Sequence, residues 1–547
     1  MKGFLRTTTV FVVASGLGIL IGAFLPRDDD FFAIRKSFEI YGSIYEELVS
    51  SYVDDIEPER LMRTGINAML ADLDPFTVFF DEADNADMDI ITRGSYGGVG
   101  LNVGVRNGRI TVIAPIEGAS GYKQGVRAGD VIVRVQERPT TDLSISDVQN
   151  LLRGEPGTTV EISVEREGLG EPISFILTRQ EVKLHNVSYS GRIPGTDVGY
   201  VRLDRFAHEA GHEVRKAVES LFEEGALDGF ILDLRDNPGG LLDAAVEITE
   251  LFVPRGSVVV STNGRLAETK RVYRSSKDPL LKDTPLVVLV NGLSASASEI
   301  VAGAAQDLDR GIVVGSTTFG KGLVQIVRGL PYNTSLKITT SRYYTPSGRS
   351  IQSANYGFGH EPESIGSTSE DVFSTTAGRK VRSGHGIEPD IAVDADPSPL
   401  ESALRRKAAF FFFANHFAAT RDSVSLDFVP GDDLLQEFES WLAEQEFTFE
   451  TPAELALQDI SAVLASSEIR NADDEVDGLR KAIEAEKDSS FERHREKLRE
   501  RLRAEIVARY HGETDQIRSS FESDVYVREG LAVLENTARY RSVLSGS

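Results

Sequence analysis

The chain predicts a multidomain α/β protein in which helical segments precede and follow two strand-containing regions. Short apolar strands separated by glycine-rich turns fill 95–180, strands alternate with amphipathic helices over 187–393, and an acidic helical stretch follows from 397. A single core stops growing near about 250–300 residues, so 547 residues should form several domains. We expect a membrane segment at 1–27, a helical segment at 28–92, a small β-rich domain at 93–181, an α/β core at 182–395 and an acidic helical extension at 396–547.

The composition excludes several classes of function. The net charge is −26, which argues against a nucleic-acid partner because such proteins need basic patches to neutralise phosphate. It also disfavours adsorption to anionic lipid. The chain has no cysteine, which excludes disulfides, thiol catalysis and metal sites with cysteine ligands.

The first residues predict how the chain is delivered. Lys2 and Arg6 precede an uncharged, mostly apolar run at 7–25, and three aspartates follow at 28–30. Positive charge before such a run and acid after it predict that the bulk of the chain is exported. The run is long enough to span a bilayer, and no small-x-small cleavage site ends it. We therefore expect a single-span anchor in the inner membrane with the remainder in the periplasm; the alternative is a cleaved signal peptide.

The segment from 31 to about 86 is expected to be helical. Its apolar and aromatic residues recur at helical spacing, and the pattern stops at Pro75. The recurring residues are Phe38, Tyr41, Ile44, Tyr45, Leu48 and Tyr52.

Two motifs in the β-rich region resemble those of a PDZ domain. The first reads Y-G-G-V-G-L-N-V at 96–103 and the second G-V-R-A-G-D-V-I at 125–132. A glycine-rich loop can present several amides to a peptide carboxylate, and the strand after it can pair with an added peptide strand. The residues expected to bind the peptide are Gly98, Val99, Gly100, Leu101, Asn102 and Val103.

Two segments of the α/β core carry the chemistry. The apolar run 286–290, expected to be a buried strand, leads into N-G-L-S-A-S-A-S-E-I at 291–300, and F-G-K-G-L-V-Q follows at 319–325. A serine on a tight strand-to-helix turn is exposed, and the amides that open the helix can stabilise an oxyanion. The lysine lies between two glycines with no acid between 317 and 330, so it can be buried and lose its proton as a general base must.

Together these segments resemble the C-terminal processing peptidases, serine endopeptidases with a Ser-Lys-Gln site. The middle serine of S-A-S-A-S corresponds to the nucleophile, the lysine 25 residues later to the base, and a glutamine four residues further to the third residue. The resemblance therefore implies Ser296, Lys321 and Gln325 as the catalytic residues. It also implies a core similar to the crotonase and ClpP folds, with the PDZ domain inserted.

The same resemblance implies an oxyanion hole and a coupling residue. The turn R-D-N-P-G-G at 235–240 is similar to the family's motif, in which a glycine amide joins the amide after the nucleophile. The donors here would be Ala297 and either Gly239 or Gly240. In bacterial relatives a PDZ arginine couples tail binding to activity, and Arg153 is the candidate. If Lys321 to Val327 were a regular strand, Gln325 would lie about 13 Å from Lys321, so a bend is required.

One motif competes with this interpretation. His208, Glu209 and His212 match H-E-x-x-H, the helix of zinc proteases. The apolar face of the helix that follows points away from both histidines, so we expect the pair to face solvent. Gly211 also weakens the helix where a zinc site needs it firm. A Ser-His-Asp site is disfavoured because no G-x-S-x-G surrounds Ser296.

These observations predict an exported serine endopeptidase that needs no cofactor. It would capture apolar C-terminal tails of protein substrates through the PDZ domain and cleave through an acyl-enzyme. The alternatives are a non-catalytic PDZ adaptor on a protease-like core, the zinc protease, and a crotonase-type acyl enzyme. The intact Ser296 and Lys321 argue against the first, and the lack of a recognisable coenzyme-A site argues against the last. Homo-oligomer formation through the C-terminal helices is left open.

Overall fold

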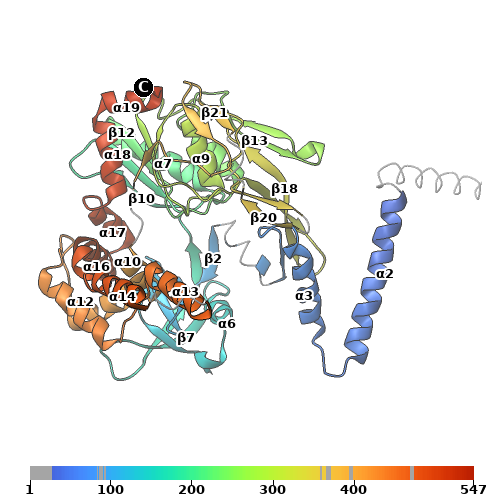
Figure 1. The fold of residues 1–547 in the computed structure, drawn as a ribbon, viewed down its shortest axis with the longest axis horizontal. Helices are drawn as coiled ribbons and strands as arrows, with labels where there is room; N and C mark the ends of the chain where they lie inside the picture. The colour runs from blue at the N-terminus through green and yellow to red at the C-terminus, as the bar shows by residue number, and fades with distance from the viewer. Residues whose placement is uncertain are drawn as a thin grey trace, which may run out of the picture. The chain divides into compact units, whose positions relative to one another are not determined.

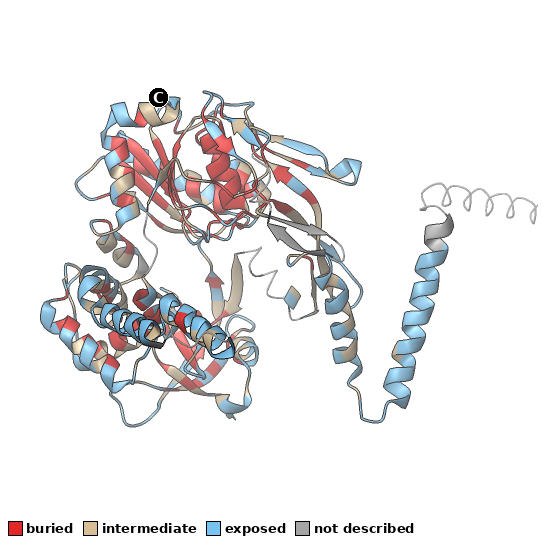
Figure 2. Cartoon of the chain, in the orientation of Figure 1, coloured by how far each residue is buried: buried red, intermediate tan, exposed pale blue. Residues whose placement is uncertain are grey.

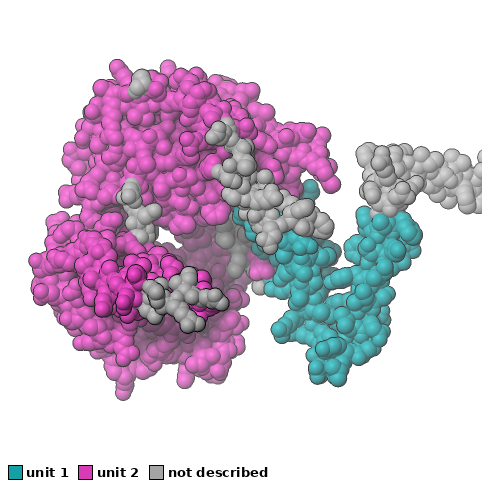
Figure 3. Space-filling view, in the orientation of Figure 1, with its two compact units in different colours: residues 1–81, 327–338, 356–361 teal, residues 82–326, 339–355, 362–547 magenta. Residues whose placement is uncertain are grey.

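The computed structural model describes residues 28–546 except 83, 86–89, 91–93, 358–359, 365–370, 394–397 and 468–472. The expected membrane span at 7–25 lies outside the described residues. Among the residues described, no helix is long and apolar enough to cross a membrane. The chain forms two compact units, which Figure 3 distinguishes by colour and which are treated separately below.

The first unit comprises the N-terminal residues to Asp81 with 327–338 and 356–361. Two helices stand where one helical segment was expected, α2 (Asp28–Ser51) and α3 (Pro58–Ala71) (Figure 1). The break was missed: Pro58 opens α3 at a position that tolerates proline, and Glu57 before it is extended, as pre-proline residues prefer. Strand β1 (Val78–Phe80) then pairs antiparallel with the start of β18 (Ser335–Tyr344).

The second unit contains the domain expected to resemble PDZ. Its main sheet runs β3-β4-β5-β7-β8, with β3 at one edge and α6 packed against β3. The core is formed by alternating strand residues such as Val103, Val112 and Ile162, together with Val148 of α6. The elements are β2 (Ser95–Gly98), β3 (Leu101–Arg106), β4 (Arg109–Pro115), α5 (Ser120–Lys123), β5 (Val131–Val135), β6 (Arg138–Pro139), α6 (Ile145–Leu152), β7 (Thr159–Glu165), β8 (Ile173–Thr178) and β9 (Gln180–Lys183).

A six-stranded sheet of order β10-β11-β12-β15-β16-β23 forms the α/β core. Strand β10 is antiparallel to β11, and every other neighbouring pair is parallel. Parallel strands covered on both faces read as continuous apolar runs, which explains L-V-V-L-V at 286–290. The strands are β10 (Val187–Arg192), β11 (Val198–Leu203), β12 (Gly229–Asp233), β15 (Leu286–Val290), β16 (Ile312–Gly315) and β23 (Ile391–Ala392).

Different parts of the chain cover the two faces of this sheet. One face packs on α7 (Ala210–Glu223), α8 (Leu242–Thr249) and α9 (Ala297–Asp307). The other packs on the last three helices, α17 (Glu513–Ser520), α18 (Val525–Glu535) and α19 (Thr537–Ser545). Figure 2 shows the buried residues concentrated in the sheet and α9. The C-terminal helices therefore complete the core, which the sequence did not indicate.

Further strands form smaller sheets. Strand β13 pairs with β14 and with β18, and β17 pairs with β18. Buried ion pairs join the segments that close the core, with Arg349 beside Asp307 at 2.9 Å and Arg379 beside Asp309 at 2.7 Å. These strands are β13 (Val258–Gly264), β14 (Arg271–Arg274), β17 (Leu323–Gly329), β19 (Ala354–Gly357), β20 (His360–Ser364), β21 (Val372–Ser374) and β22 (Lys380–Arg382).

The remaining C-terminal helices have a core of their own. A charged helix such as α16 is usually a solvated face, but α16 buries Leu498, Leu502 and Ile506 within this helical core. The same helices contact the PDZ-like domain, where His416 lies 3.0 Å from Glu167. These helices are α10 (Pro399–Arg406), α11 (Ala409–Thr420), α12 (Asp432–Glu444), α13 (Pro452–Ser466), α14 (Asp473–Asp488), α15 (Ser490–Arg493) and α16 (Arg495–Tyr510).

The packing of the last helices on the sheet predicts a stability effect. Phe521 is 3% exposed, and its ring centroid lies 4.8 Å from that of Tyr200 and 5.3 Å from that of Tyr189. We expect Phe521→Ala to lower the free energy of unfolding by about 3–5 kcal/mol, because the change leaves a cavity against the sheet. Urea denaturation would measure it. Phe38→Ala, which alters a side chain 73% exposed, should cost less than about 1 kcal/mol. Equal losses would contradict this account.

Candidate active site

The middle serine of the S-A-S-A-S run differs from its neighbours. The hydroxyls of Ser294 and Ser298 are fully buried and donate to the carbonyls of Leu234 and Asn237. Ser296 is half-buried and lies directly before α9, with φ 56° and ψ −109°. A non-glycine residue in this region is strained, and such strain is concentrated at functional sites. The backbone therefore presents Ser296 where its neighbours are used for structure.

A single buried carboxylate, that of Glu299, joins the two segments predicted to be catalytic. Its Oε2 accepts hydrogen bonds from the backbone amides of Ser296 at 2.7 Å and Lys321 at 2.9 Å. Its Oε1 accepts from the Gly320 amide at 2.7 Å and the Thr318 hydroxyl at 2.6 Å. Glu299 has no exposed surface. The sequence showed no acid near the lysine, but the fold supplies one from α9.

The environment of Glu299 shifts its titration toward neutral pH. Burial raises the pKa of this carboxyl to about 7, because the charged form loses its hydration. The hydrogen bonds from Thr318, Lys321, Ser296 and Gly320 favour the charged form and limit the rise in the pKa. The carboxyl group of Glu299 therefore gains or loses its proton close to neutral pH.

Tyr343 makes a second connection between the same two segments. Its hydroxyl lies 3.1 Å from the carbonyl oxygen of Ser296 and also contacts the carbonyl of Lys321. Burial, followed by the charge of Glu299, raises the pKa of Tyr343 well above 10, so it remains a neutral donor. Glu299 and Tyr343 thus each hold the backbones of both Ser296 and Lys321.

The turn at 235–240 is tied to the nucleophile segment. The carbonyl of Asn237 accepts from the Ala295 amide at 3.0 Å and from the Ser298 hydroxyl at 2.9 Å. A Cβ added to Gly239 would lie 2.8 Å from the Ala297 nitrogen and 2.9 Å from the Ser296 Cβ. Only glycine permits this approach, so Gly239 brings the turn against Ser296.

The two glycines of this turn differ in the state of their amides. The Gly239 amide donates to the Asn237 side chain at 2.9 Å. In the described part of the chain, no hydrogen bond is found for the Gly240 amide. Gly240 has φ 150°, and a Cβ there would lie 2.3 Å from the Phe206 carbonyl oxygen, so this position also requires glycine. Ala297 is the first residue of α9, where amides have no partner within the helix.

The other residues predicted for the site lie in two places. Gln325 is in β17, and its side-chain amide donates to the Thr339 hydroxyl of β18 at 3.1 Å. Arg153 ends α6, bridges to Gly98, and its guanidinium lies 5.7 Å from the ring centroid of Tyr96. The predicted peptide-binding residues 98–103 form the loop before β3 and the first half of this edge strand, with Asn102 exposed.

The H-E-x-x-H motif does not form a zinc-protease helix. Helix α7 begins at Ala210, so His208 lies in the turn before it rather than one turn from His212. His208, Glu209 and His212 are all exposed. Among the described residues, no three or more His, Asp or Glu side chains are grouped so that they could hold a metal ion. The expected solvent-facing position of the pair is confirmed.

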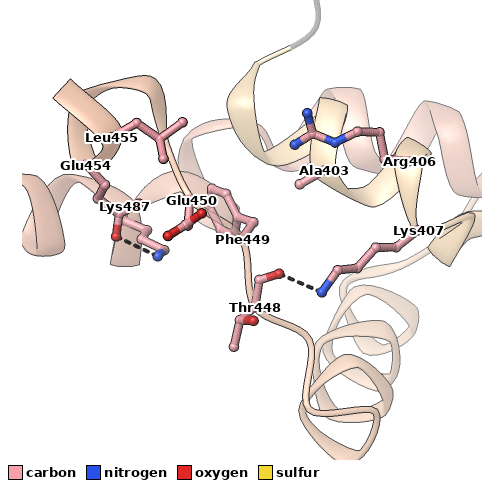
Figure 4. A pocket seen from close by; sticks show the side chains of 9 residues that line it. All are labelled: Ala403, Arg406, Lys407, Thr448, Phe449, Glu450, Glu454, Leu455 and Lys487. Atoms are coloured by element: carbon pink, nitrogen blue, oxygen red, sulfur yellow. Dashed lines mark hydrogen bonds and ion pairs between the residues drawn. The ribbon is translucent and has the colours of Figure 1, made fainter. Parts of the chain in front are cut away.

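A pocket of about 640 Å³ lies among the C-terminal helices (Figure 4). Two of its lysines bind other residues that line the pocket. Lys487 pairs with Glu454 at 2.8 Å, and Lys407 donates to the Thr448 carbonyl at 2.8 Å. None of the predicted catalytic residues lines it. The pocket therefore belongs to the helical core and not to this site.

Sequence reasoning missed two residues of the site. Glu299 was interpreted only as the start of a helix, although S-x-x-E at 296–299 is the pattern of a capping box and indicates that the glutamate returns to the serine amide. Tyr343 lies in β18, and its hydroxyl meets Lys321 in the segment before β17, a contact that no local pattern predicts.

Three family profiles match the chain. The profile described as "Peptidase family S41" matches residues 197–365, one described as "PDZ domain" matches 111–166, and one described as "Probable PDZ-protease, C-terminal helical domain" matches 400–534. The three matches fall on the α/β core, the β-rich domain and the C-terminal helices in turn. The PDZ domain expected from the glycine-rich loop is thereby confirmed.

Curated relatives carry related names. A carboxy-terminal-processing protease of Bartonella bacilliformis is 37% identical over 333 residues, which cover 60% of this chain and 75% of that protein. A carboxyl-terminal-processing protease of Synechocystis is 38% identical over 293 residues, covering 53% and 68%. Among solved structures, a photosystem II D1 C-terminal processing protease matches 66% of this chain and 88% of its own at 30% identity, with a TM-score of 0.37.

The raised pKa of Glu299 predicts how stability depends on pH. The folded-state pKa of about 7 lies above the ordinary 4.5, so between these values the folded chain holds a proton that the unfolded chain has lost. The wild type should therefore lose up to about 3 kcal/mol of stability, relative to Glu299→Gln, as pH rises from 5 to 8. Denaturant titrations at several pH values would measure the difference. Glu209→Gln, an exposed control, should show no such trend, and a pH-independent difference for Glu299→Gln would contradict the account.

Proposed function

The chain belongs to the carboxy-terminal processing proteases of peptidase family S41, and from this premise we propose that Ser296 and Lys321 carry its peptidase activity. It is a serine-type peptidase. The observation that supports these two residues is that Glu299 and Tyr343 each bind the backbones of both. The backbones of Ser296 and Lys321, 25 positions apart in the sequence, are thereby held close to each other, as those of a nucleophile and its base must be.

In the proposed mechanism Lys321 acts while its amine is neutral. Its Nζ takes the proton of the Ser296 hydroxyl as Oγ bonds to the carbonyl carbon of the scissile peptide. The protonated lysine then gives that proton to the leaving nitrogen, and the C–N bond breaks to leave an acyl-enzyme. A water molecule gives a proton to Lys321 as its oxygen attacks the ester carbon. The lysine returns that proton to Ser296 Oγ as the ester bond breaks, and the product leaves as a carboxylic acid, which ionises in water. Gln325 would orient Lys321 from β17.

The oxyanion of the tetrahedral intermediate would be held by the amides of Ala297 and Gly240. The choice of Gly240 rests on the hydrogen bond that already occupies the Gly239 amide. Gly239 would instead provide the close approach of the turn to the serine. Each such donor is typically worth about 3 kcal/mol of transition-state stabilisation.

Substrate selection would be the task of the PDZ domain. Strand β3 ends the sheet of this domain and has α6 beside it, which is the arrangement that accepts an added peptide strand. Residues 97–100 comprise the end of β2 and the turn into β3, and the amides of this turn would bind the terminal carboxylate. Arg153, beside Gly98 at the end of α6, would report occupancy of the groove to the active site.

Delivery of the enzyme is proposed from the sequence pattern alone. The basic residues before the apolar run 7–25 and the aspartates after it favour export, attachment to the inner membrane and a periplasmic site of action. We place the domain limits at 1–27, 28–92, 93–181, 182–395 and 396–547.

The assignment of the nucleophile and base predicts the behaviour of two variants. Ser296→Ala should lower kcat by at least about 10⁴-fold on an unfolded reporter protein, and Lys321→Ala by at least about 10²-fold. A fluorophosphonate probe should label the wild type and not Ser296→Ala. Activity should be indifferent to EDTA. Cleavage that survives in Ser296→Ala and stops with EDTA would overturn the mechanism and return attention to His208, Glu209 and His212.

Carboxylate capture by the PDZ loop predicts a dependence on the end of the substrate. A peptide with an apolar tail and a free C-terminal carboxylate should bind the Ser296→Ala variant at least about tenfold more tightly than the same peptide amidated, because each charge-assisted hydrogen bond strengthens binding by a kilocalorie or more. Fluorescence anisotropy would compare the two. Equal affinities would show that the tail is not recognised by its terminus.

A further inference from the structure

We propose that Asp524, from the C-terminal helical extension, is a positioning residue that sets the geometry of the oxyanion turn through Arg235. The inference rests on the proposed function, because it assigns a role to a residue outside the protease core in the same active site. It also gives the last helices a task besides covering the sheet.

The contact between the two residues is bidentate and largely shielded from water. Arg235 NH1 donates to Asp524 Oδ1 at 3.0 Å, and NH2 lies 2.8 Å from Oδ2. The side chains are 11% and 18% exposed. The guanidinium also lies over the ring of Tyr526, 4.8 Å from its centroid. A two-pronged, shielded pair of this kind fixes orientation as well as distance.

Arg235 is at the same time bound to the core sheet. Its Nε donates to both carboxylate oxygens of Asp233, at 2.9 and 3.0 Å, and NH2 donates to Oδ2 at 2.6 Å. Asp233 is fully buried at the end of β12 and accepts the Tyr200 hydroxyl at 2.5 Å. The neighbouring Arg235 charge opposes burial and holds the pKa of Asp233 below its usual value. Arg235 therefore joins the last strand residue to the C-terminal helices.

The turn that follows Arg235 needs such support. Asp236, Gly239 and Gly240 all have positive φ, at 62°, 95° and 150°. Glycine adopts positive φ readily, but Asp236 does so only where its surroundings hold it. Asp236 is held by Asn291, whose side chain accepts from its amide at 3.0 Å, and Arg235 is held by Asp524. Displacing Arg235 would move the glycines of this turn, of which Gly239 lies against Ser296 and Gly240 is the proposed donor.

The substitution Asp524→Asn separates this role from another one. Asp524 also caps α18, because Oδ1 accepts from the amides of Tyr526 and Val527. Asparagine is an equally good cap but has no charge for Arg235. The matched control is Glu529→Gln in the same helix, which removes a carboxylate paired with Arg539 at 2.6 Å on the surface.

We expect Asp524→Asn to lower kcat about tenfold with KM within twofold, a fraction of the roughly 10²–10³-fold cost of losing an oxyanion donor outright. The rate of fluorophosphonate labelling of Ser296 should fall in parallel, while Glu529→Gln matches the wild type. If Asp524→Asn does not fold, Tyr526→Leu, which removes the ring beneath Arg235, should lower kcat in the same direction. Unchanged kcat and labelling in these variants, or a lower melting temperature alone, would overturn the proposal. Absence of labelling and cleavage in the wild type would instead refute the proposed function.

Discussion

The catalytic arrangement depends on the buried carboxylate of Glu299. This carboxylate accepts four hydrogen bonds, from the amide of Ser296 and from the segment 318–321. In that segment the donors are the Thr318 hydroxyl and the amides of Gly320 and Lys321. Burying a carboxyl group costs free energy that only such donors can offset. The four donors come from the two segments that carry Ser296 and Lys321. The free-energy cost of burying Glu299 is therefore offset only when these two segments have come together. Tyr343 binds the same two backbones in the complementary way: its hydroxyl donates to their carbonyls, whereas Glu299 accepts from their amides.

Different helices pack on the two faces of the six-stranded sheet. The face under α7, α8 and α9 carries the nucleophile, and the face under α17 to α19 carries the support for Arg235. The ends of β12 and β15 place the glycine turn at 235–240 and the turn at 291–296 side by side, because these strands are parallel neighbours. Ligand sites form at the carboxyl ends of parallel strands for this reason.

The sequence predicted those features of the fold and the site that depend on residues close together in the chain. The alternation of strands and helices, the glycine-rich loop at 97–100 and the spacing of Ser296 and Lys321 are all visible in consecutive residues, and Pro58 could have been interpreted as a break. Contacts across the chain could not be predicted in this way. Arg235 meets a carboxylate 289 residues later, and the Tyr343 hydroxyl meets the carbonyl of Lys321, 22 residues earlier in the chain. Such contacts depend on which surfaces the whole fold brings together, and no single segment records that.

The position of α17 to α19 has a consequence for biosynthesis. A ribosome releases Ser296, Lys321 and the glycine turn well before it makes these helices, and domains form as their residues emerge. Until the helices arrive, Tyr200, Ile231 and Val287 lack their covering layer, and Arg235 has one carboxylate partner instead of two. A chain interrupted during synthesis or translocation would thus carry every catalytic residue and still lack a finished site. With the roles proposed for Ser296 and Arg235, the order of the sequence delays proteolytic competence until α17 to α19 have been made.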